Sequence, residues 1–306
     1  MLWSSLVMLA ACSEPAAAPA APEVSSEVAP KPPQQRTSTG RRLVAIGDLH
    51  GDPLAALATL QLAGIADEEG NWVGGDTVFV QTGDTTDRGP DSAGVIDLLR
   101  VLQDQAPQFG GEVHLLLGNH EVMNLQGDWR YVSPEDVAGF GGQANRALAF
   151  SKRGEYGRFL SKLPLVVKVD DTIFVHGGVT PEFAALGIDG INTRARQHYF
   201  DRQGPGGDAI LGDTGPIWYR GYINDPEEQS CATLDRALEA LGAKRMVVGH
   251  TTRRDGIVQA RCGGRVTVID IGISAHYGAH IGAWESINGD ARAIMPSGPS
   301  DLPDPI

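Results

Sequence analysis

Three apolar stretches, each followed by a glycine and an oxygen-bearing polar residue, constrain the fold more than any other feature. They are Leu43–Ile46, Thr77–Gln81 and Val113–Leu117. The segments between them are typical of helices, since Pro53–Gly64 has proline at its start and glycine at its end, and Asp91–Gln105 begins with a capping aspartate. This alternation predicts a right-handed βαβαβ unit, whose parallel strands deliver the residues after them to one edge of a sheet.

The second half of the chain is richer in strands, which we expect to form a second sheet packed on the first. A helix is predicted over Glu227–Leu241, and the predicted strands are Leu165–Val169, Thr172–Val175, Arg245–Val248, Gly256–Ala260, Arg265–Ile269 and about His280–Ile287, the last three antiparallel. We therefore expect an α/β (α+β) architecture of two mixed β-sheets packed as a sandwich flanked by helices. The polar, glycine-rich segment Val122–Ala149 has no clear pattern and is expected to cap the functional site.

The chain ends differ from the body. Residues 1–12 are apolar up to Leu9-Ala10-Ala11-Cys12, which is similar to a bacterial lipobox, and residues 13–41 form an Ala/Pro-rich segment typical of a disordered tether. We expect export to the periplasmic face of a bacterial membrane, with a lipid anchor at Cys12 as the membrane attachment. Because no Lys or Arg precedes the apolar stretch, a cytoplasmic protein or an upstream start remains an alternative. Residues 42–295 are expected to form the domain and residues 296–306 a loose tail.

The net charge limits the partners that we expect, and the cysteines bear on the compartment. The net charge of -13 disfavours nucleic acid, so an anionic substrate requires a local positive site, which metal ions can supply. Of the three cysteines, Cys231 and Cys262 remain if Cys12 carries lipid. Exported proteins oxidise such pairs, and two free thiols are the alternative.

Five short motifs follow the ends of apolar runs, in the order Gly47–Gly51, Gly83–Gly89, Gly118–Glu121, His176–Gly178 and Gly249–His250. Their Asp and Asn residues could instead cap loops, but five loops imitating ligands together is the weaker explanation. The first divalent ion is expected on Asp48, His50 and Asp84, and the second on Asp84, Asn119, His176 and His250. Mixed nitrogen and oxygen ligands suit Mn, Fe or Zn better than Ca or Mg. Two ions about 3.5–4 Å apart polarise a phosphoryl group and generate a bridging hydroxide for attack.

Three further residues in these motifs suit catalysis. His120 directly follows a metal ligand and is better placed as a general acid for the leaving oxygen than as another ligand. Asp87 is expected to orient that imidazole, and the planar guanidinium of Arg88 suits two phosphate oxygens. A surface salt bridge is the alternative role for Arg88.

From about Arg42 to Ile287 the pattern resembles the PPP superfamily of dinuclear metallophosphatases. Asn119–Asn124, Gly127–Val132 and Gly215–Gly221 resemble the bacterial Shewanella-like protein phosphatases. The resemblance implies the metallophosphoesterase αββα fold and a metal-dependent protein phosphatase, a phosphoric monoester hydrolase. The resemblance assigns the same metal-ligand, general-acid and phosphate-clamp roles to the residues named above. The Shewanella-like branch is similar to tyrosine-directed phosphatases.

Three arginines are candidates for the second phosphate clamp. Arg220, beside Trp218 and Tyr219, is the first candidate, with Arg194 and Arg196 next and a structural loop role as the alternative. Substrate contacts are expected from Arg88, Arg220, Asn119 and Tyr277, although Tyr277 suits packing equally well. An aromatic wall of Trp129, Trp218, Tyr219 and Tyr277 suits a phenyl phosphate.

The expected substrate is therefore a phosphorylated protein or a small phosphomonoester, with a possible preference for phosphotyrosine. A dinucleoside-polyphosphate or phosphodiester hydrolase on the same metal core remains an alternative. A non-catalytic metal-binding lipoprotein is another, although a pure binding site needs neither His120 nor Arg88.

Overall fold

The predicted βαβαβ unit is present in the computed structural model, which describes residues 1–2, 40–201 and 207–305. Three strands pair in parallel, joined by two helices: β1 (Arg42–Ile46), α1 (Pro53–Leu62), β2 (Val78–Gln81), α2 (Ser92–Gln105) and β3 (Glu112–Leu115). Asp91 caps α2 as predicted, because its carboxylate accepts the amide hydrogen of Gly94. Most of the expected signal and most of the expected tether lie outside the described residues.

Three C-terminal strands complete this first sheet. They are β9 (Ala283–Ile287), β10 (Asp290–Met295) and β11 (Gly298–Asp301), and the strand order among the described residues is β11-β10-β9-β1-β2-β3. Two expectations were wrong. The strand ending at Ile287 pairs with β1 rather than joining the second sheet, because it satisfies the free edge of β1. Residues 296–306 do not form a wholly loose tail, since β11 pairs with β10 and the amide of Leu302 bonds the carbonyl of Ala291.

The second sheet has the strand order β4-β5-β6-β8-β7 in the described part of the chain. Its strands are β4 (Val166–Val169), β5 (Thr172–Val175), β6 (Arg245–Val248), β7 (Gln259–Arg261) and β8 (Val266–Val268). β5, β6 and β8 run parallel, and α10 (Glu227–Leu241) precedes β6 as predicted. This sheet therefore also directs the residues after three neighbouring strands to one edge.

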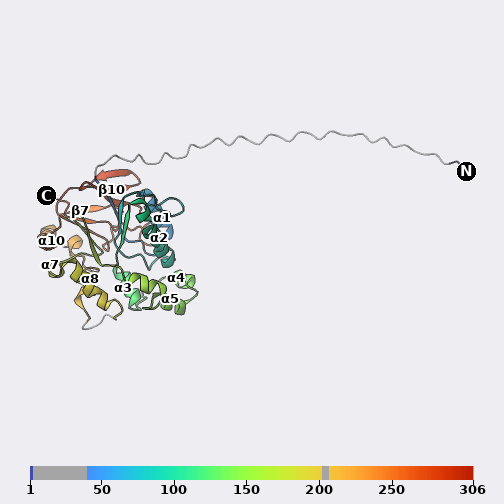
Figure 1. Ribbon diagram of the computed structural model, residues 1–306, viewed down its shortest axis with the longest axis horizontal. Helices are drawn as coiled ribbons and strands as arrows, with labels where there is room; N and C mark the ends of the chain where they lie inside the picture. The colour runs from blue at the N-terminus through green and yellow to red at the C-terminus, as the bar shows by residue number, and fades with distance from the viewer. Residues whose placement is uncertain (3–39, 202–206, 306) are drawn as a thin grey trace. The chain divides into compact units, whose positions relative to one another are not determined.

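The two sheets pack face to face around one apolar core. Phe174 of β5 and Trp284 of β9 are fully buried, and their ring centroids lie 5.7 Å apart. Figure 1 shows both sheets with α1 and α2 beside the first and α10 beside the second. The predicted sandwich of two mixed sheets flanked by helices is confirmed.

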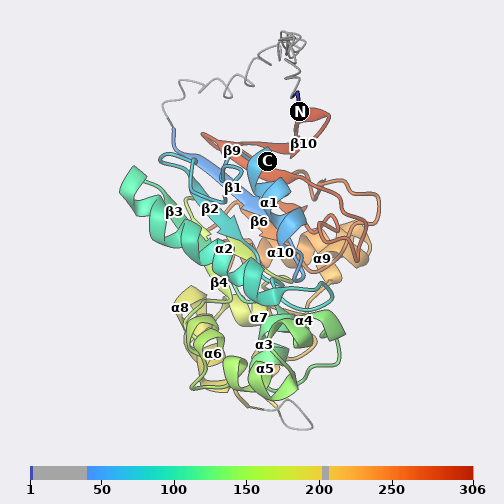
Figure 2. The same ribbon diagram turned by 90° about the vertical axis from the view of Figure 1, so that its right-hand side faces the viewer.

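The segment without a clear pattern, Val122–Ala149, is largely helical. Together with the segments after it, it supplies α3 (Asn119–Leu125), α4 (Pro134–Gly139), α5 (Gln143–Phe150), α6 (Glu155–Leu160), α7 (Pro181–Ala184), α8 (Gly187–His198) and α9 (Gly221–Asn224). Figure 2 shows α3 to α8 gathered at one end of the folded unit, with β9 and β10 toward the other. The helices are short, so each depends on packing more than on its own propensity.

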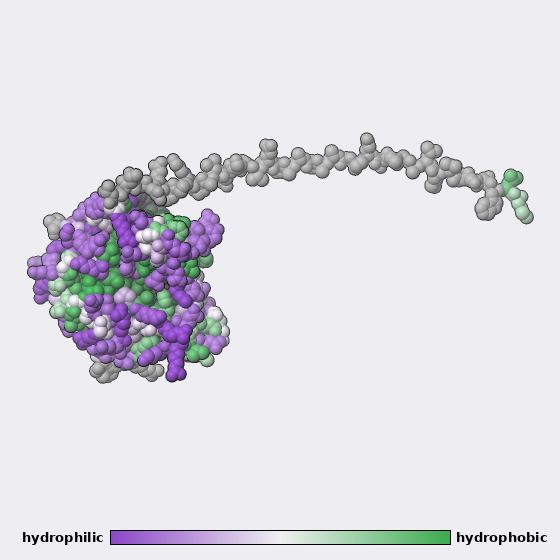
Figure 3. Space-filling view, in the orientation of Figure 1, coloured by the Kyte–Doolittle hydropathy of each residue, from purple (hydrophilic) through white to green (hydrophobic). Residues whose placement is uncertain are grey.

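The surface and the cysteines complete the description. Hydrophilic residues cover most of the face drawn in Figure 3, around a smaller hydrophobic area. None of the helices in the described residues combines the length and apolar character needed to cross a bilayer. Cys231 and Cys262 form a disulfide with 5.3 Å between their Cα atoms, as the oxidised alternative predicted.

Candidate active site

Residues that follow parallel strands of both sheets converge at one edge of the sandwich. β1, β2 and β3 are followed by Asp48, Asp84 and Asn119, and β5, β6 and β8 by His176, His250 and Asp270. Direct contacts join the two sets. The amide of His250 lies 3.2 Å from both carboxylate oxygens of Asp48, and Nε2 of His176 lies 3.0 Å from Oδ1 of Asn119.

Asp84 occupies the centre of this cluster. Its Oδ2 lies 3.2 Å from Nε2 of His176 and 3.8 Å from Nε2 of both His50 and His120. Two groups of ligand atoms, each within 4.8 Å of one another, share this carboxylate: His50, Asp84 and His120, and Asp84, His176 and His250. A carboxylate between two sets of donors is the arrangement that a bridging ligand requires.

Electrostatics favour the cation-binding forms of His50, His250 and Asp84. Burial lowers the pKa of His50 to about 3 and lowers the pKa of His250 well below its usual value. Burial alone would raise the pKa of Asp84, but the imidazoles of His176 and His120 bring it well below its usual value. Neutral imidazoles and an ionised carboxylate are the forms that bind metal ions.

A further buried carboxylate strengthens this fit. Oδ2 of Asp270 is buried and has no hydrogen-bond partner within the described residues. Burial, Asp270 and Asp84 together raise the pKa of Asp48, so these carboxylates repel one another without a counter-charge. Crowded acids of this kind are stabilised by a cation, and the nitrogen and oxygen donors around them suit divalent metal ions.

Several site residues have a left-handed backbone. The φ angles are 45° at His50, 56° at Asp84, 69° at Asp87, 68° at Arg88 and 64° at His250. Residues other than glycine rarely adopt this backbone conformation. It persists only where the surrounding structure enforces it. The strand-end loops are therefore held in strained geometry at candidate ligand and catalytic positions.

Glu121 enforces the geometry of the Asp84 loop. Its buried carboxylate accepts the backbone amides of Gly118, Asp84, Thr85 and Thr86 at 2.8–3.0 Å. It also accepts both threonine hydroxyls at 3.0 Å. Glu121 lies within the third motif, but the motif does not predict this role.

His120 and Asp87 form an oriented pair. Nδ1 of His120 lies 2.7 Å from Oδ2 of Asp87, and the other Asp87 oxygen accepts a 2.8 Å hydrogen bond from Asn124 and lies 3.5 Å from Nη2 of Arg146. Burial would lower the pKa of His120, but Asp84 and Asp87 raise it above its usual value. The charged imidazole is therefore favoured, with its Nε2 on the side of Asp84.

Both candidate clamp arginines line a cavity of about 100 Å³ beside this pair. The guanidinium of Arg88 lies 3.9 Å from the ring centroid of Tyr131, and its buried Nε has no partner in the part of the chain that the structure describes. Arg220 reaches the cavity and donates to the carbonyl of His250. Arg194 instead pairs with Asp208.

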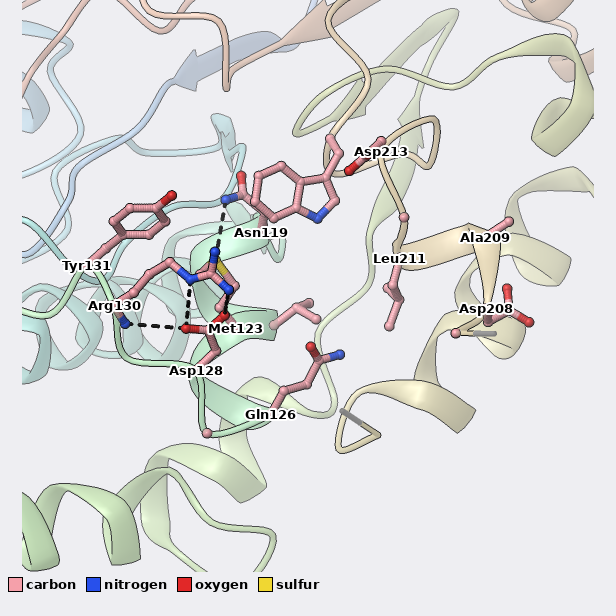
Figure 4. A pocket seen from close by; sticks show the side chains of 15 residues that line it. Asn119, Met123, Gln126, Asp128, Arg130, Tyr131, Asp208, Ala209, Leu211 and Asp213 are labelled. Carbon is pink, nitrogen blue, oxygen red and sulfur yellow. Dashed lines mark hydrogen bonds and ion pairs between the residues drawn. The ribbon is translucent and has the colours of Figure 1, made fainter. Parts of the chain in front are cut away.

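A larger groove of about 790 Å³ shares the lining residues Asn119, Tyr131 and Trp218 with this cavity. Figure 4 shows the side chains that line the groove. Its lining combines apolar side chains with acids and one arginine: Val122, Met123, Leu211, Asp128, Asp208, Asp213 and Arg130. Asp128 pairs with Arg130, and Asp208 with Arg194. The cavity beside Asp84 therefore adjoins a wider groove, whose lining has more acidic than basic side chains.

Besides Glu121, two more buried residues of the site were missed from the sequence. Asp270 follows a predicted apolar strand, so the signal used for Asp48 and Asp84 could have identified it. Arg146 is fully buried on α5 and bonds Asp136 and Asn124 at 2.7 and 2.6 Å. An arginine in a sequence segment without a clear pattern has no signal that distinguishes it from a surface residue.

Comparisons with known proteins agree with this geometry. Residues 41–254 match the calcineurin-like phosphoesterase family. Shewanella-like protein phosphatase 2 of Arabidopsis thaliana is 31% identical over 79% of this chain and 73% of its own, and Shewanella-like protein phosphatase 1 of Plasmodium berghei is 32% identical over 76% and 67%. A crystal structure of a cold-active protein-tyrosine phosphatase from a psychrophilic Shewanella species covers 86% of this chain and 80% of its own, with a TM-score of 0.76 and 28% identity. The chain therefore belongs to the calcineurin-like phosphoesterases and, among them, to the Shewanella-like protein phosphatases, which are metal-dependent enzymes.

Proposed function

We propose that the protein hydrolyses phosphate monoesters on proteins, prefers phosphotyrosine, and uses two divalent ions, which Asp84 and the ligand groups on either side of it would hold. One observation carries the proposal: the cavity beside Asp84 is lined by His120, Arg88 and Arg220 together. A proton donor and two anion-binding arginines around a metal-ligand cluster suit the transfer of a phosphoryl group. A site that only stored metal would need none of the three.

Each residue has a separate task. Arg88 and Arg220 bind phosphate oxygens, because a guanidinium offers parallel N–H donors to an anion. His120 donates a proton from Nε2 to the leaving oxygen, and Asp87 holds the imidazole in that orientation. The divalent ions, when bound, supply Lewis-acid polarisation and an activated water.

The aromatic surroundings support an aryl phosphate substrate. Tyr277 lies 4.9 Å from the ring of His50, and Trp218 lies 5.6 Å from the ring of His250. Both line the cavity together with Tyr131. Tyr219, expected in the same wall, instead packs against Tyr222 at 4.8 Å. A phenyl ring bound between these side chains would gain the offset and edge-to-face contacts that aromatic pairs favour.

The adjoining groove supports a protein substrate over a small phosphomonoester. It opens directly from the cavity and is far larger than a phosphate group requires. An extended peptide whose phosphorylated residue enters the cavity would continue into it. The relatives named above are protein phosphatases, and the Shewanella structure is of a protein-tyrosine phosphatase.

Manganese and an exported, lipid-anchored location complete the proposal. The mixed donor set suits Mn, Fe or Zn, and manganese is the first choice. The Cys231–Cys262 disulfide supports an oxidising compartment. Fractionating cells that express the wild-type protein and a Cys12→Ser variant tests the anchor, because only the wild type should remain with the membranes.

Kinetics on metal-loaded protein test the activity. We expect p-nitrophenyl phosphate to be hydrolysed faster than bis(p-nitrophenyl) phosphate, and a phosphotyrosine peptide faster than its phosphoserine counterpart. After a chelator has removed the metal, manganese should restore the activity best. A faster diester reaction would favour the phosphodiesterase alternative. Metal binding without turnover of any ester would favour the binding-protein alternative.

A further inference from the structure

The short helix directly after Arg220 is held by side chains from two distant elements. α9 (Gly221–Asn224) has a single turn, so most of its carbonyl groups lack partners within the helix. At its N-terminal end, the guanidinium of Arg220 reaches His250, with Nη2 3.4 Å from the ring Nδ1. The contacts that hold α9 in place therefore also determine the position of the Arg220 guanidinium relative to the cavity.

Two donors, Arg261 of β7 and Ser230 of α10, hold the carbonyl groups of this segment. Arg261 donates to the carbonyls of Tyr222, Ile223 and Asp225 at 2.6, 2.5 and 2.9 Å. The Ser230 hydroxyl lies 2.9 Å from the carbonyl of Gly221 and 3.3 Å from that of Asp225, so its single hydrogen serves both. Neither donor is among the residues that line the cavity.

The disulfide joins the residues that immediately follow these two donors. Cys231 follows Ser230 and Cys262 follows Arg261. Glu227 reinforces the junction by accepting the amide of Cys262 at 2.8 Å. The start of α10 and the turn after β7 therefore cannot separate while the disulfide is intact, and both donors stay on α9.

We propose that Arg261 and Ser230, locked together by the Cys231–Cys262 disulfide, are positioning residues for Arg220. They act through α9, which they hold in the place from which Arg220 reaches the substrate phosphate. Loss of either donor or of the disulfide lets α9 shift and weakens phosphate binding, while the metal ligands stay in place. The inference rests on the proposed role of Arg220 as a phosphate clamp.

Inorganic phosphate is the probe, because its dissociation constant can be measured by calorimetry without any turnover. Arg261→Gln is compared in the wild type and in an Arg220→Ala background, with Arg100→Gln on the surface of α2 as the matched control. We expect Arg261→Gln to weaken phosphate binding about 3- to 10-fold in the wild type, as loss of part of a charge-assisted contact would, and Arg100→Gln to have no effect. In the Arg220→Ala background the same change should have no effect, because the residue it positions is gone.

An equal effect of Arg261→Gln in both backgrounds, or no effect in either, overturns the proposal. Metal content must equal that of the wild type, and Arg261→Lys, which keeps a charged donor, should recover part of the binding. Reducing the disulfide should weaken phosphate binding in the wild type but not in Arg220→Ala, and reoxidation should restore it. If phosphate binds as expected while no ester is hydrolysed, the proposed function fails and the positioning role stands.

Discussion

Replacing His120 with asparagine separates proton donation from metal binding. The imidazole is the group that Asp87 orients, with 2.7 Å between Nδ1 and Oδ2, and asparagine cannot donate a proton to a leaving alkoxide. General acid catalysis contributes about 10²- to 10⁴-fold to rate, so we expect kcat for a phosphoserine peptide to fall by that factor. The loss for p-nitrophenyl phosphate should be much smaller, because its leaving group departs readily without a proton.

The partner variant Asp87→Asn tests whether the carboxylate acts through the imidazole. Asp87 is fully buried and contacts His120, Asn124 and Arg146. Asp87→Asn alone should show the same dependence on leaving group, with a smaller loss. The double variant should be no slower than His120→Asn, because two residues that act as a unit give non-additive effects.

The assay combines steady-state kinetics on both substrates with elemental analysis of metal content. Metal content should match the wild type in both single variants. Equal losses on the two substrates would refute the general-acid role. Loss of metal from His120→Asn would mean that His120 is a ligand, which its place in the His50–Asp84–His120 group makes the competing assignment.

Three further changes probe the rest of the site. Asp84→Asn should lose both metal and activity, because its Oδ2 is common to the two ligand groups, and elemental analysis checks this; full metal content would exclude a bridging role. Arg88→Ala should weaken inorganic phosphate binding about 10- to 100-fold with metal content unchanged, and a wild-type dissociation constant would remove Arg88 from the clamp. Arg146→Met should lower the free energy of unfolding by about 3–5 kcal/mol in chemical denaturation, because it leaves the buried carboxylate of Asp136 without its cation and removes the guanidinium beside Asp87; an unchanged midpoint would contradict this.

Local signals explain why so much of the site could be predicted. The proline at the start of α1 and the capping aspartate of α2 are local signals that predict where these helices begin. The apolar runs before and after the helices then predict parallel strands. Once those strands are parallel, Asp48, Asp84 and Asn119 must meet at one edge. The convergence of the site followed from local patterns combined with one topological rule.

What could not be predicted depends on distant partners. β11 has the sequence GPSD, which has no strand propensity, and it is a strand because β10 offers an edge to pair with. The strand β9 carries no mark of which sheet it joins, and that choice depends on the free edge of β1. The sequence predicted Arg220 only as one of several candidates, because its contact with His250 joins residues 30 positions apart and leaves no local signal.

The start of α3 explains how one short motif serves several functions. Asn119 faces His176, His120 bonds Asp87, and Glu121 turns back to the amides of the Asp84 loop, because successive helical residues point in different directions. That loop holds Asp84, Asp87 and Arg88 at positive φ, a conformation these residues rarely adopt. Glu121 binds this loop from the same turn of α3 that bears His120, the proposed general acid. The proposed metal ligand Asp84, the His120 partner Asp87 and the proposed clamp Arg88 are therefore held close to that acid by one buried carboxylate.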